Sequence, residues 1–197
     1  STSTPLRTVF FGTSDIAQLS LAALSIDPDF RIVGVVTQPD RPVGRKQEIQ
    51  FPPIKEWAIT IGLQDVVMQF DQVKSDEAYN ALRTLQADLA VVMSFGQIIP
   101  QRILELFPLG VINVHPSLLP KYRGATPINA AIANGDKETG IAIMKMDALM
   151  DHGPIYAIEH VRIEPTDTTG TLSQRISHLS ADLLVRTLRH KKEEKTL

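Results

Sequence analysis

The sequence contains no cysteine, so disulfide bonds and thiolate metal ligands are excluded. Aromatic residues make up only 6% of the chain. No apolar run approaches the roughly 18 residues that a membrane-spanning helix needs. The formal net charge is −2, which provides no overall attraction to nucleic acid. We therefore expect a cytoplasmic protein without membrane contact, in which any nucleic-acid binding depends on a local basic patch.

The chain has 197 residues, 43% of them hydrophobic, which is enough for one domain with a sizeable core. Short apolar runs typical of buried strands occur at residues 7–13, 31–38, 65–70, 88–95 and 110–115. Helical patterns separate these runs, at residues 14–26, 53–61, 75–86 and 100–107. This alternation predicts a parallel sheet with helices on both faces.

The last third of the chain has a different pattern. Residues 139–147 and 153–165 alternate between apolar and polar types, which predicts two paired strands, and an amphipathic helix follows over residues 168–194. The predicted fold class is α/β: a Rossmann-like mixed, mostly parallel sheet flanked by helices, with an antiparallel edge. We expect the domain to span residues 1–190 and residues 191–197 to form a solvated tail.

The first predicted strand ends in a turn at Gly12 and Thr13. Backbone amides in such a turn can approach a ligand closely. The turn lacks the G-x-G-x-x-G spacing, so a dinucleotide is poorly supported as that ligand.

The stretch GVINVHPSLLPKYRG, residues 110–124, contains a polar pair inside an apolar strand. Asn113 and His115 are two positions apart, so their side chains lie on the same face of that strand. Pro116 ends the strand directly after the histidine. In open α/β sheets, ligands bind at the carboxyl ends of strands. The alternative is that both side chains only satisfy buried backbone groups in a turn.

Asp151, in the loop DALMDHG at residues 147–153, is the third member of a candidate constellation with Asn113 and His115. A carboxylate stabilises a nearby imidazole as imidazolium. A cationic histidine beside an amide donor suits an oxyanion on a tetrahedral carbon, and the carboxylate can accept a proton. No serine, Ser117 included, has a nucleophile-elbow setting. The set therefore favours direct transfer of an acyl group to an amine or to water.

A metal site is the alternative use of the same region. It would take its ligands from His115, Asp147, Asp151 and His152. Their spacing matches no zinc pattern, and aspartate-rich loops are usually surface turns. We therefore expect no metal.

The longest irregular segment is PDRPVGRKQEIQFPP, residues 39–53, with the basic residues Arg41, Arg45 and Lys46. A loop of this length inside a compact domain is usually functional or mobile. An ordinary solvated loop is the other interpretation, and the residues alone leave both open.

The pattern around the polar pair resembles the signature of the folate-dependent formyltransferases. It consists of Asn113-x-His115, the run Pro116-Ser117-Leu118-Leu119-Pro120, and Tyr122-Arg123-Gly124. Asp151 falls at the position of that family's catalytic aspartate. The resemblance implies that Asn113, His115 and Asp151 are catalytic, that 10-formyltetrahydrofolate is the donor, and that no metal is needed. It implies folate contacts at Phe95, Gly96, Gln97, Ile98, Ser117, Leu118, Leu119, Pro120, Asp147 and Gly153.

A narrower match is to the members of this family that formylate initiator methionyl-tRNA. It rests on FGTSDIA near the start, TQPDRPVGR at residues 37–45, SFGQIIP at residues 94–100 and RGATPI at residues 123–128. In those members the long loop engages the acceptor end of the tRNA. The resemblance therefore implies acceptor contacts at Gly12, Thr13, Arg41, Arg45, Lys46 and Arg123.

Two departures from these members are visible. The loop continues as RKQEIQFPP with fewer lysines, and the chain ends at Leu197 without the family's C-terminal β-barrel. We expect a monomer that binds tRNA weakly, because affinity for nucleic acid depends on the number of phosphate contacts. The open alternatives are another acceptor, either an amino-sugar nucleotide or glycinamide ribonucleotide, and a non-catalytic folate- or RNA-binding module.

Overall fold

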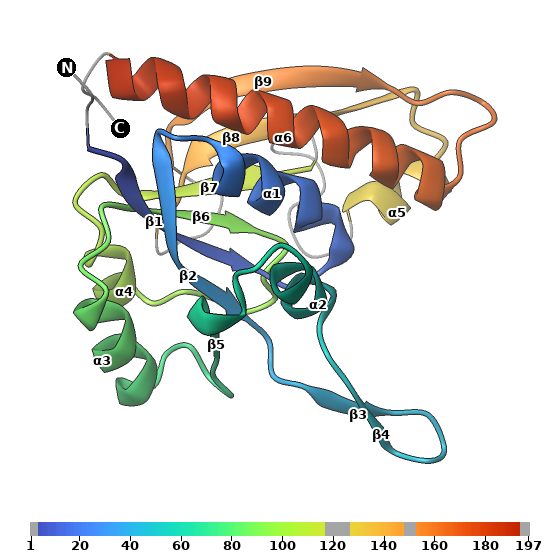
Figure 1. Ribbon diagram of the computed structural model, residues 1–197. Coiled ribbons are helices and arrows are strands. Elements are labelled where there is room, and N and C mark those ends of the chain that lie inside the picture. Colours follow the sequence, from blue (N-terminus) through green and yellow to red (C-terminus); the bar gives the residue numbers. More distant parts are fainter. Residues whose placement is uncertain (1–3, 117–126, 148–152, 194–197) are drawn as a thin grey trace.

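The computed structural model describes residues 4–116, 127–147 and 153–193 (Figure 1). Its centre is a seven-stranded sheet with the order β5-β2-β1-β6-β7-β8-β9. The strands are β1 (Leu6–Gly12), β2 (Phe30–Thr37), β5 (Val67–Gln69), β6 (Leu89–Met93), β7 (Val111–His115), β8 (Glu138–Lys145) and β9 (Ile155–Arg162). The first five are parallel, whereas β8 pairs antiparallel with both β7 and β9. The predicted α/β fold with an antiparallel edge is confirmed.

Helices cover both faces of the sheet, as near-continuous apolar strands require. One face packs against α1 (Gln18–Ile26), α2 (Pro53–Thr60), α5 (Pro127–Ala133) and α6 (Thr169–Glu193). The other packs against α3 (Asp76–Thr84) and α4 (Gln101–Leu104). Alternation along β1 divides its side chains between the two layers: Phe10 faces the α1 side, whereas Val9 and Phe11 face the α3 side.

Several predicted helix starts are correct. α2 begins at Pro53, and the Ser75 hydroxyl caps α3 by accepting a hydrogen bond from the Ala78 amide at 3.1 Å. The start at Ser14 is different, because its side chain makes no capping bond and its amide reaches the Ser94 carbonyl instead. A short 3-10 turn, η1 (Asp15–Ala17), therefore precedes α1.

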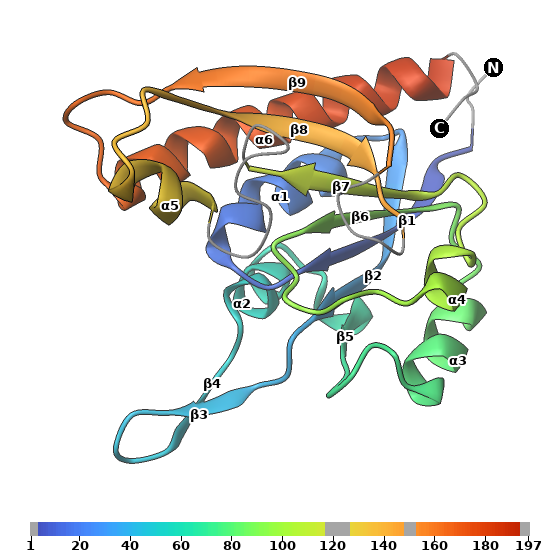
Figure 2. The ribbon, with the colours of Figure 1, turned by 180° about the vertical axis from the view of Figure 1, so that it is seen from behind.

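The segment predicted as an irregular loop is a hairpin. Strands β3 (Arg41–Val43) and β4 (Glu48–Gln50) pair antiparallel and form a sheet of their own. Residues 41–50 are all exposed, and the hairpin projects away from the body of the domain (Figure 2). The prediction of an irregular loop was wrong because these strands are too short and too exposed to show a hydrophobic period.

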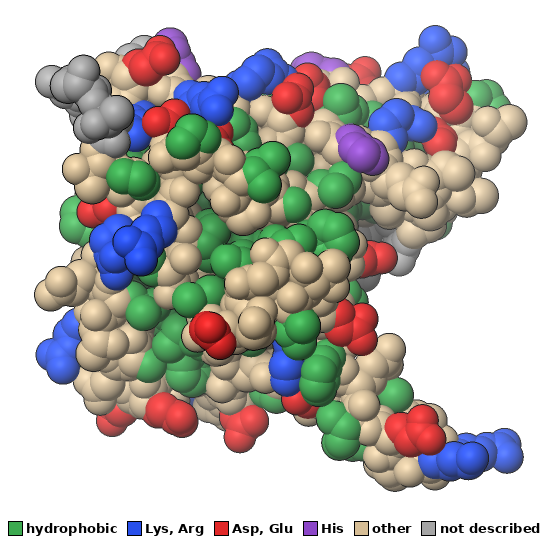
Figure 3. Space-filling view, viewed as in Figure 1, with side chains coloured by type: hydrophobic (Ala, Val, Ile, Leu, Met, Phe, Trp, Pro, Cys, Tyr) green, Lys and Arg blue, Asp and Glu red, His purple; other side chains and the backbone are tan. Residues whose placement is uncertain are grey.

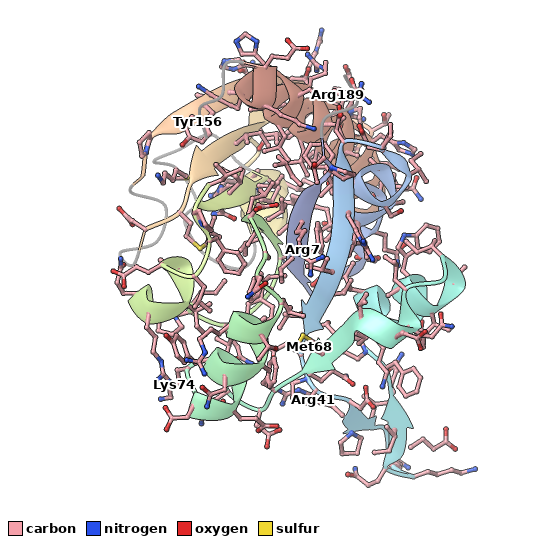
Figure 4. The ribbon with its side chains drawn as sticks, turned by 60° about the vertical axis from the view of Figure 1, so that its left-hand side comes forward. Arg7, Arg41, Met68, Lys74, Tyr156 and Arg189 are labelled. Atoms are coloured by element: carbon pink, nitrogen blue, oxygen red, sulfur yellow. The ribbon has the colours of Figure 1, made fainter. Side chains whose placement is uncertain are left out.

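The end of α6 is attached to the turn between α1 and β2. Arg189 donates to the buried carboxylate of Asp27 at 2.6 Å, and Lys192 donates to Asp29 at 3.2 Å. Figure 4 shows Arg189 on this last part of the helix. Since α6 continues to Glu193, the expected boundary at residue 190 falls inside the helix. Over the described ranges, no helix has the length and apolar character to cross a membrane.

Replacing Asp27 with alanine should destabilise the domain. The carboxylate accepts from both the Asp29 amide and Arg189, so its loss leaves that amide without its acceptor and leaves Arg189 only the longer contact with Asp29, and it should cost about 1–3 kcal/mol. Urea unfolding followed by circular dichroism would measure the change. Asp182→Ala is the matched control, because Asp182 pairs with Arg186 of the same helix at an exposed site. An equal effect of the two substitutions would contradict the anchoring role of Asp27.

Candidate functional site

A large cavity opens at the carboxyl ends of the parallel strands. Its volume is about 1010 Å³, and its wall includes Thr13 after β1, Ser94 after β6 and His115 at the end of β7. After β1 the chain continues outward on one side of the sheet, to β2. After β6 it continues outward on the other side, to β7, so the strand order reverses between β1 and β6. Crevices at such a switch point are the usual ligand sites of open α/β sheets. Figure 3 shows that the surface is hollowed between the body and the projecting hairpin.

Asn113 and His115 lie together in the wall of this cavity. They are 8% and 5% exposed, and both belong to the strand β7. Ile112 and Val114 alternate with them and pack in the core on the α1 side. The prediction that the amide and the imidazole share one face at a strand end is therefore confirmed. Neighbouring donors of this kind suit a developing negative charge on a substrate oxygen.

Thr13 joins four segments around the cavity. Its amide donates to the Ser94 carbonyl at 2.9 Å, and its hydroxyl donates to the Phe95 carbonyl at 2.6 Å. The same hydroxyl accepts from the Gln38 amide at 3.4 Å, and the Thr13 carbonyl accepts from the Ile54 amide at 3.1 Å. Thr13 lines the cavity as expected, but its polar groups bind the chain itself.

The turn after β6 has an unusual backbone. Ser94 has a φ of 53° and Gly96 a φ of 93°. The positive φ of Gly96 favours glycine by conformation, and a Cβ atom there would also displace the end of the Gln38 side chain, 2.9 Å away. This geometry presents the backbone of the turn to the cavity, where Phe95, Gly96, Gln97 and Ile98 all contribute to the wall.

In this turn the side chains of Phe95 and Gln97 are held in place, whereas that of Ile98 is exposed. The Phe95 ring packs edge-on against Phe11 in the core, so only its backbone is available to a ligand. Ile98 is 65% exposed and offers an apolar surface. Gln97 is held in place, because its Oε1 accepts from the Val73 amide at 2.7 Å and its Nε2 donates to Gln38 Oε1 at 2.8 Å.

Gly12 is not among the residues that line the cavity, and its role in acceptor binding stays a prediction. A Cβ atom here would lie 2.7 Å from the Phe10 ring and 2.9 Å from the Met93 carbonyl oxygen. The structure therefore accounts for Gly12 by the close packing of β1 against β6.

Asp147 and Gly153 flank the loop that was expected to contact folate. Neither lines the cavity, whereas the neighbouring Met146 does. A Cβ atom on Gly153 would overlap the Lys145 carbonyl oxygen. Gly153 thus serves the tight approach of the two chain segments that lead into the loop, which the sequence did not indicate.

Six predicted site residues lie outside the described residues. They are Ser117, Leu118, Leu119, Pro120, Arg123 and Asp151. Their roles stay predictions. In the described part of the chain, no cluster of three or more His, Asp or Glu side chains could hold a metal ion.

The structure separates the basic residues of the hairpin. Arg41 lines the cavity at the base of the hairpin (Figure 4), whereas Arg45 and Lys46 lie in the turn at its tip and do not line it. The three basic residues therefore do not form one cluster, and the acceptor contacts expected for Arg45 and Lys46 stay predictions.

Sequence reasoning missed several residues of the wall, among them Gln38, Phe51 and the α6 residues Thr169 and Ser173. Gln38 could have been found, because it is a polar residue at the carboxyl end of a predicted strand, where open α/β sheets bind ligands. The α6 residues gave no such signal, since only the fold brings the start of that helix to this edge.

Comparison with known proteins places this geometry in a family. The family model described as "Formyl transferase" matches residues 6–188. The methionyl-tRNA formyltransferase of Dictyoglomus turgidum is 46% identical over 93% of this chain and 57% of its own length. That of Dictyoglomus thermophilum is 44% identical over 98% of this chain and 61% of its own length. The chain thus spans less than two thirds of these relatives.

Solved structures agree with this fold. The phosphoribosylglycinamide formyltransferase of Bacillus halodurans has a TM-score of 0.75 and 26% identity, over 92% of this chain and 93% of that one. A formyltetrahydrofolate deformylase from Pseudomonas syringae has a TM-score of 0.76 over 98% of this chain and 63% of that one. Its identity is 22%, so this second likeness concerns the fold alone.

Replacing Thr13 with valine should destabilise the domain by about 1–3 kcal/mol, because the Phe95 carbonyl and the Gln38 amide lose a partner. Thr13→Ser keeps the hydroxyl and should retain most of the stability. Urea unfolding of both variants would measure the difference. Equal stability of the valine and serine variants would show that the hydroxyl does not hold the strand ends together.

Proposed function

Because the chain belongs to the formyl transferase family, we propose that it transfers a formyl group from 10-formyltetrahydrofolate to the amino group of initiator methionyl-tRNA. The observation that carries this proposal is the buried pair of Asn113 and His115 in the wall of a large cavity. The identity of 44–46% with methionyl-tRNA formyltransferases over more than nine tenths of the chain favours this acceptor. Such a reaction would take place in the cytoplasm, where charged tRNA is used.

The cavity suits a folate donor in size and chemistry. Its volume of about 1010 Å³ lies at the top of the range of roughly 300–1,000 Å³ for ligand pockets, which leaves room for the donor and the end of an acceptor. A flat heterocycle needs an apolar surface and backbone hydrogen-bonding groups, and the turn around Gly96 offers both, with Ile98 as the apolar part. The remaining folate contacts that we propose lie in the segments around Leu119 and Asp151.

In the proposed transfer, Asn113 and His115 stabilise charge and Asp151 moves a proton. The bound donor supplies an activated formyl carbon. Asn113 and His115, as imidazolium, stabilise the oxyanion that forms on this carbon when the amine attacks. Asp151 keeps His115 charged and removes the amine proton through a water molecule. Collapse of the tetrahedral intermediate then breaks its bond to the folate nitrogen, which takes up the proton removed from the amine, and tetrahydrofolate and the formylated amine leave.

The hairpin supplies the acceptor side of the proposal. Arg41 lies at the cavity, and Arg45 and Lys46 at the tip carry charges that can meet phosphates of a long substrate. Glycinamide ribonucleotide is the second candidate acceptor, because the Bacillus halodurans enzyme shares the fold at 26% identity. A small acceptor of that kind would not need the charges of Arg45 and Lys46 at the tip of the hairpin for binding.

Replacing His115 with alanine should lower single-turnover formyl transfer to methionyl-tRNA by at least about 100-fold, because the oxyanion loses its charged partner. Asn113→Ala and Asp151→Asn should each lower transfer strongly as well. The measurement is quenched-flow transfer from 10-formyltetrahydrofolate, with circular dichroism to verify folding. His160→Ala, at an exposed site on β9, is the matched control. A folded His115→Ala variant with near-normal rates would refute the assignment.

The double variant Arg45→Gln and Lys46→Gln should weaken acceptor use and leave the donor KM unchanged. Each lost phosphate contact should also reduce the slope of log(kcat/KM) against log salt by about 1. Lys74→Gln, which removes a charge near the start of α3, is the control (Figure 4). Full activity of the hairpin variant with glycinamide ribonucleotide, together with no transfer to methionyl-tRNA by the wild type, would favour the second candidate.

A further inference from the structure

The exposed hairpin has little support of its own. Residues 41–50 are all exposed, and the apolar side chains of Val43 and Ile49 are 45% and 63% exposed. A two-stranded hairpin without a packed face is marginally stable. The direction in which β3 and β4 project must therefore be set where the chain leaves and rejoins the body.

The hairpin joins the body through two stems, residues 38–40 before β3 and residues 51–52 after β4. Lys55, in the first turn of α2, lies between these two stems. Its Nζ donates to both oxygens of Asp40 in the first stem, at 2.8 and 3.1 Å. The same Nζ lies 3.7 Å from the centre of the Phe51 ring in the second stem. One cation thus holds both stems, through an ion pair on one side and a cation–π contact on the other.

Gln69, at the end of β5, completes the attachment. Its Nε2 donates to Asp40 Oδ1 at 2.7 Å and to the Gln38 carbonyl at 3.1 Å. The hydrogen bonds from Lys55 and Gln69 lower the pKa of Asp40, so its carboxylate remains charged in neutral solution. The first stem is therefore fixed by two donors, the charged Lys55 from α2 and the neutral Gln69 from the sheet.

This ion pair is better shielded than a usual surface pair. The side chain of Lys55 is 17% exposed and that of Asp40 is 28% exposed. The pair of Arg102 with Asp76, on the α3 side, is 41% and 88% exposed. Because solvent screens exposed pairs most, the Asp40 pair can hold a geometry that the Arg102 pair cannot.

The attachment also reaches the donor side of the cavity. Gln38, whose carbonyl is held by Gln69, accepts from Gln97 Nε2 through its own side chain. Gln97 belongs to the turn that we propose to contact folate. A continuous set of contacts therefore joins the hairpin stem to that turn.

We propose that Asp40, Lys55 and Gln69 form a brace that sets the angle of the hairpin over the cavity and so positions the macromolecular acceptor. They are positioning residues: none of the three is among the residues that line the cavity, whereas the stem residues Gln38, Pro39, Phe51 and Pro52 are. The acceptor role of the brace rests on the proposed function. Its mechanical role, which is to restrain the hairpin, does not.

Removing either charge should raise the KM for methionyl-tRNA by about tenfold, the effect of a loss of some 1.4 kcal/mol in acceptor binding. Asp40→Asn and Lys55→Met each break the ion pair. The methionine retains an apolar side chain of similar length beside Phe51. The donor KM and the rate at saturating acceptor should stay near the wild-type values. The double variant should be no worse than either single one, because both substitutions break the same interaction. Arg102→Gln is the matched control and should change none of these quantities.

A second readout does not depend on catalysis. The chain has no cysteine, so Glu48→Cys places a single thiol on β4 for a fluorescent label. Fluorescence anisotropy of this label should fall in the Asp40→Asn and Lys55→Met backgrounds and remain unchanged with Arg102→Gln. The unlabelled variants should unfold at urea concentrations close to the wild-type value, which would show that the loss is local.

The outcomes separate the two proposals. An active wild type whose Asp40→Asn and Lys55→Met variants keep the acceptor KM would overturn the brace alone. Equal increases in donor and acceptor KM would also overturn it, because they would indicate general damage to the cavity. A wild type that formylates no methionyl-tRNA would overturn the proposed function, and the acceptor role of the brace with it. A raised acceptor KM with lowered anisotropy would support the brace.

Discussion

The hydroxyl of Thr13 holds the carboxyl ends of three parallel strands at one place. It donates to the turn after β6 and accepts from the residue after β2, while Thr13 itself follows β1. Parallel strands bring their ends to one edge of a sheet, but only such cross-links fix the turns relative to one another. This one small side chain thus contacts both the turn that contains Gly96 and the residue that leads towards the hairpin, and each of these segments lines the cavity.

Much of the fold was accessible from the sequence because burial imposes a pattern. Apolar strands separated by amphipathic helices predicted the sheet, and the spacing of Asn113 and His115 predicted their common face. Both inferences rest on local periodicity, which a single chain displays. The late hairpin of β8 and β9 followed from the same reasoning, since its strands alternate.

The features that were missed are long-range or unburied. Ser14 looks like a helix cap, yet its amide is taken by Ser94, some eighty positions away, and the first turn becomes 3-10. The contact of Gln97 with Gln38 gives no signal in either neighbourhood. Strands β3 and β4 are exposed on all sides, so no hydrophobic period marks them. The close packing around Gly12, against Phe10 and the Met93 carbonyl, likewise gives no signal in the sequence.

The two sides of the cavity are built by different physical means. The side that we propose for the donor consists of backbone turns that rest on the core, where Phe11 and Phe95 pack together. The side that we propose for the acceptor is a hairpin without a core of its own, which is attached at its base by polar contacts and by the contact of Lys55 with Phe51. A small donor needs a site of fixed shape, whereas a large acceptor must enter and leave past a projecting element. Polar contacts at the stem restrain that element while its tip stays exposed to solvent, so the hairpin can keep one direction over the cavity without a core of its own.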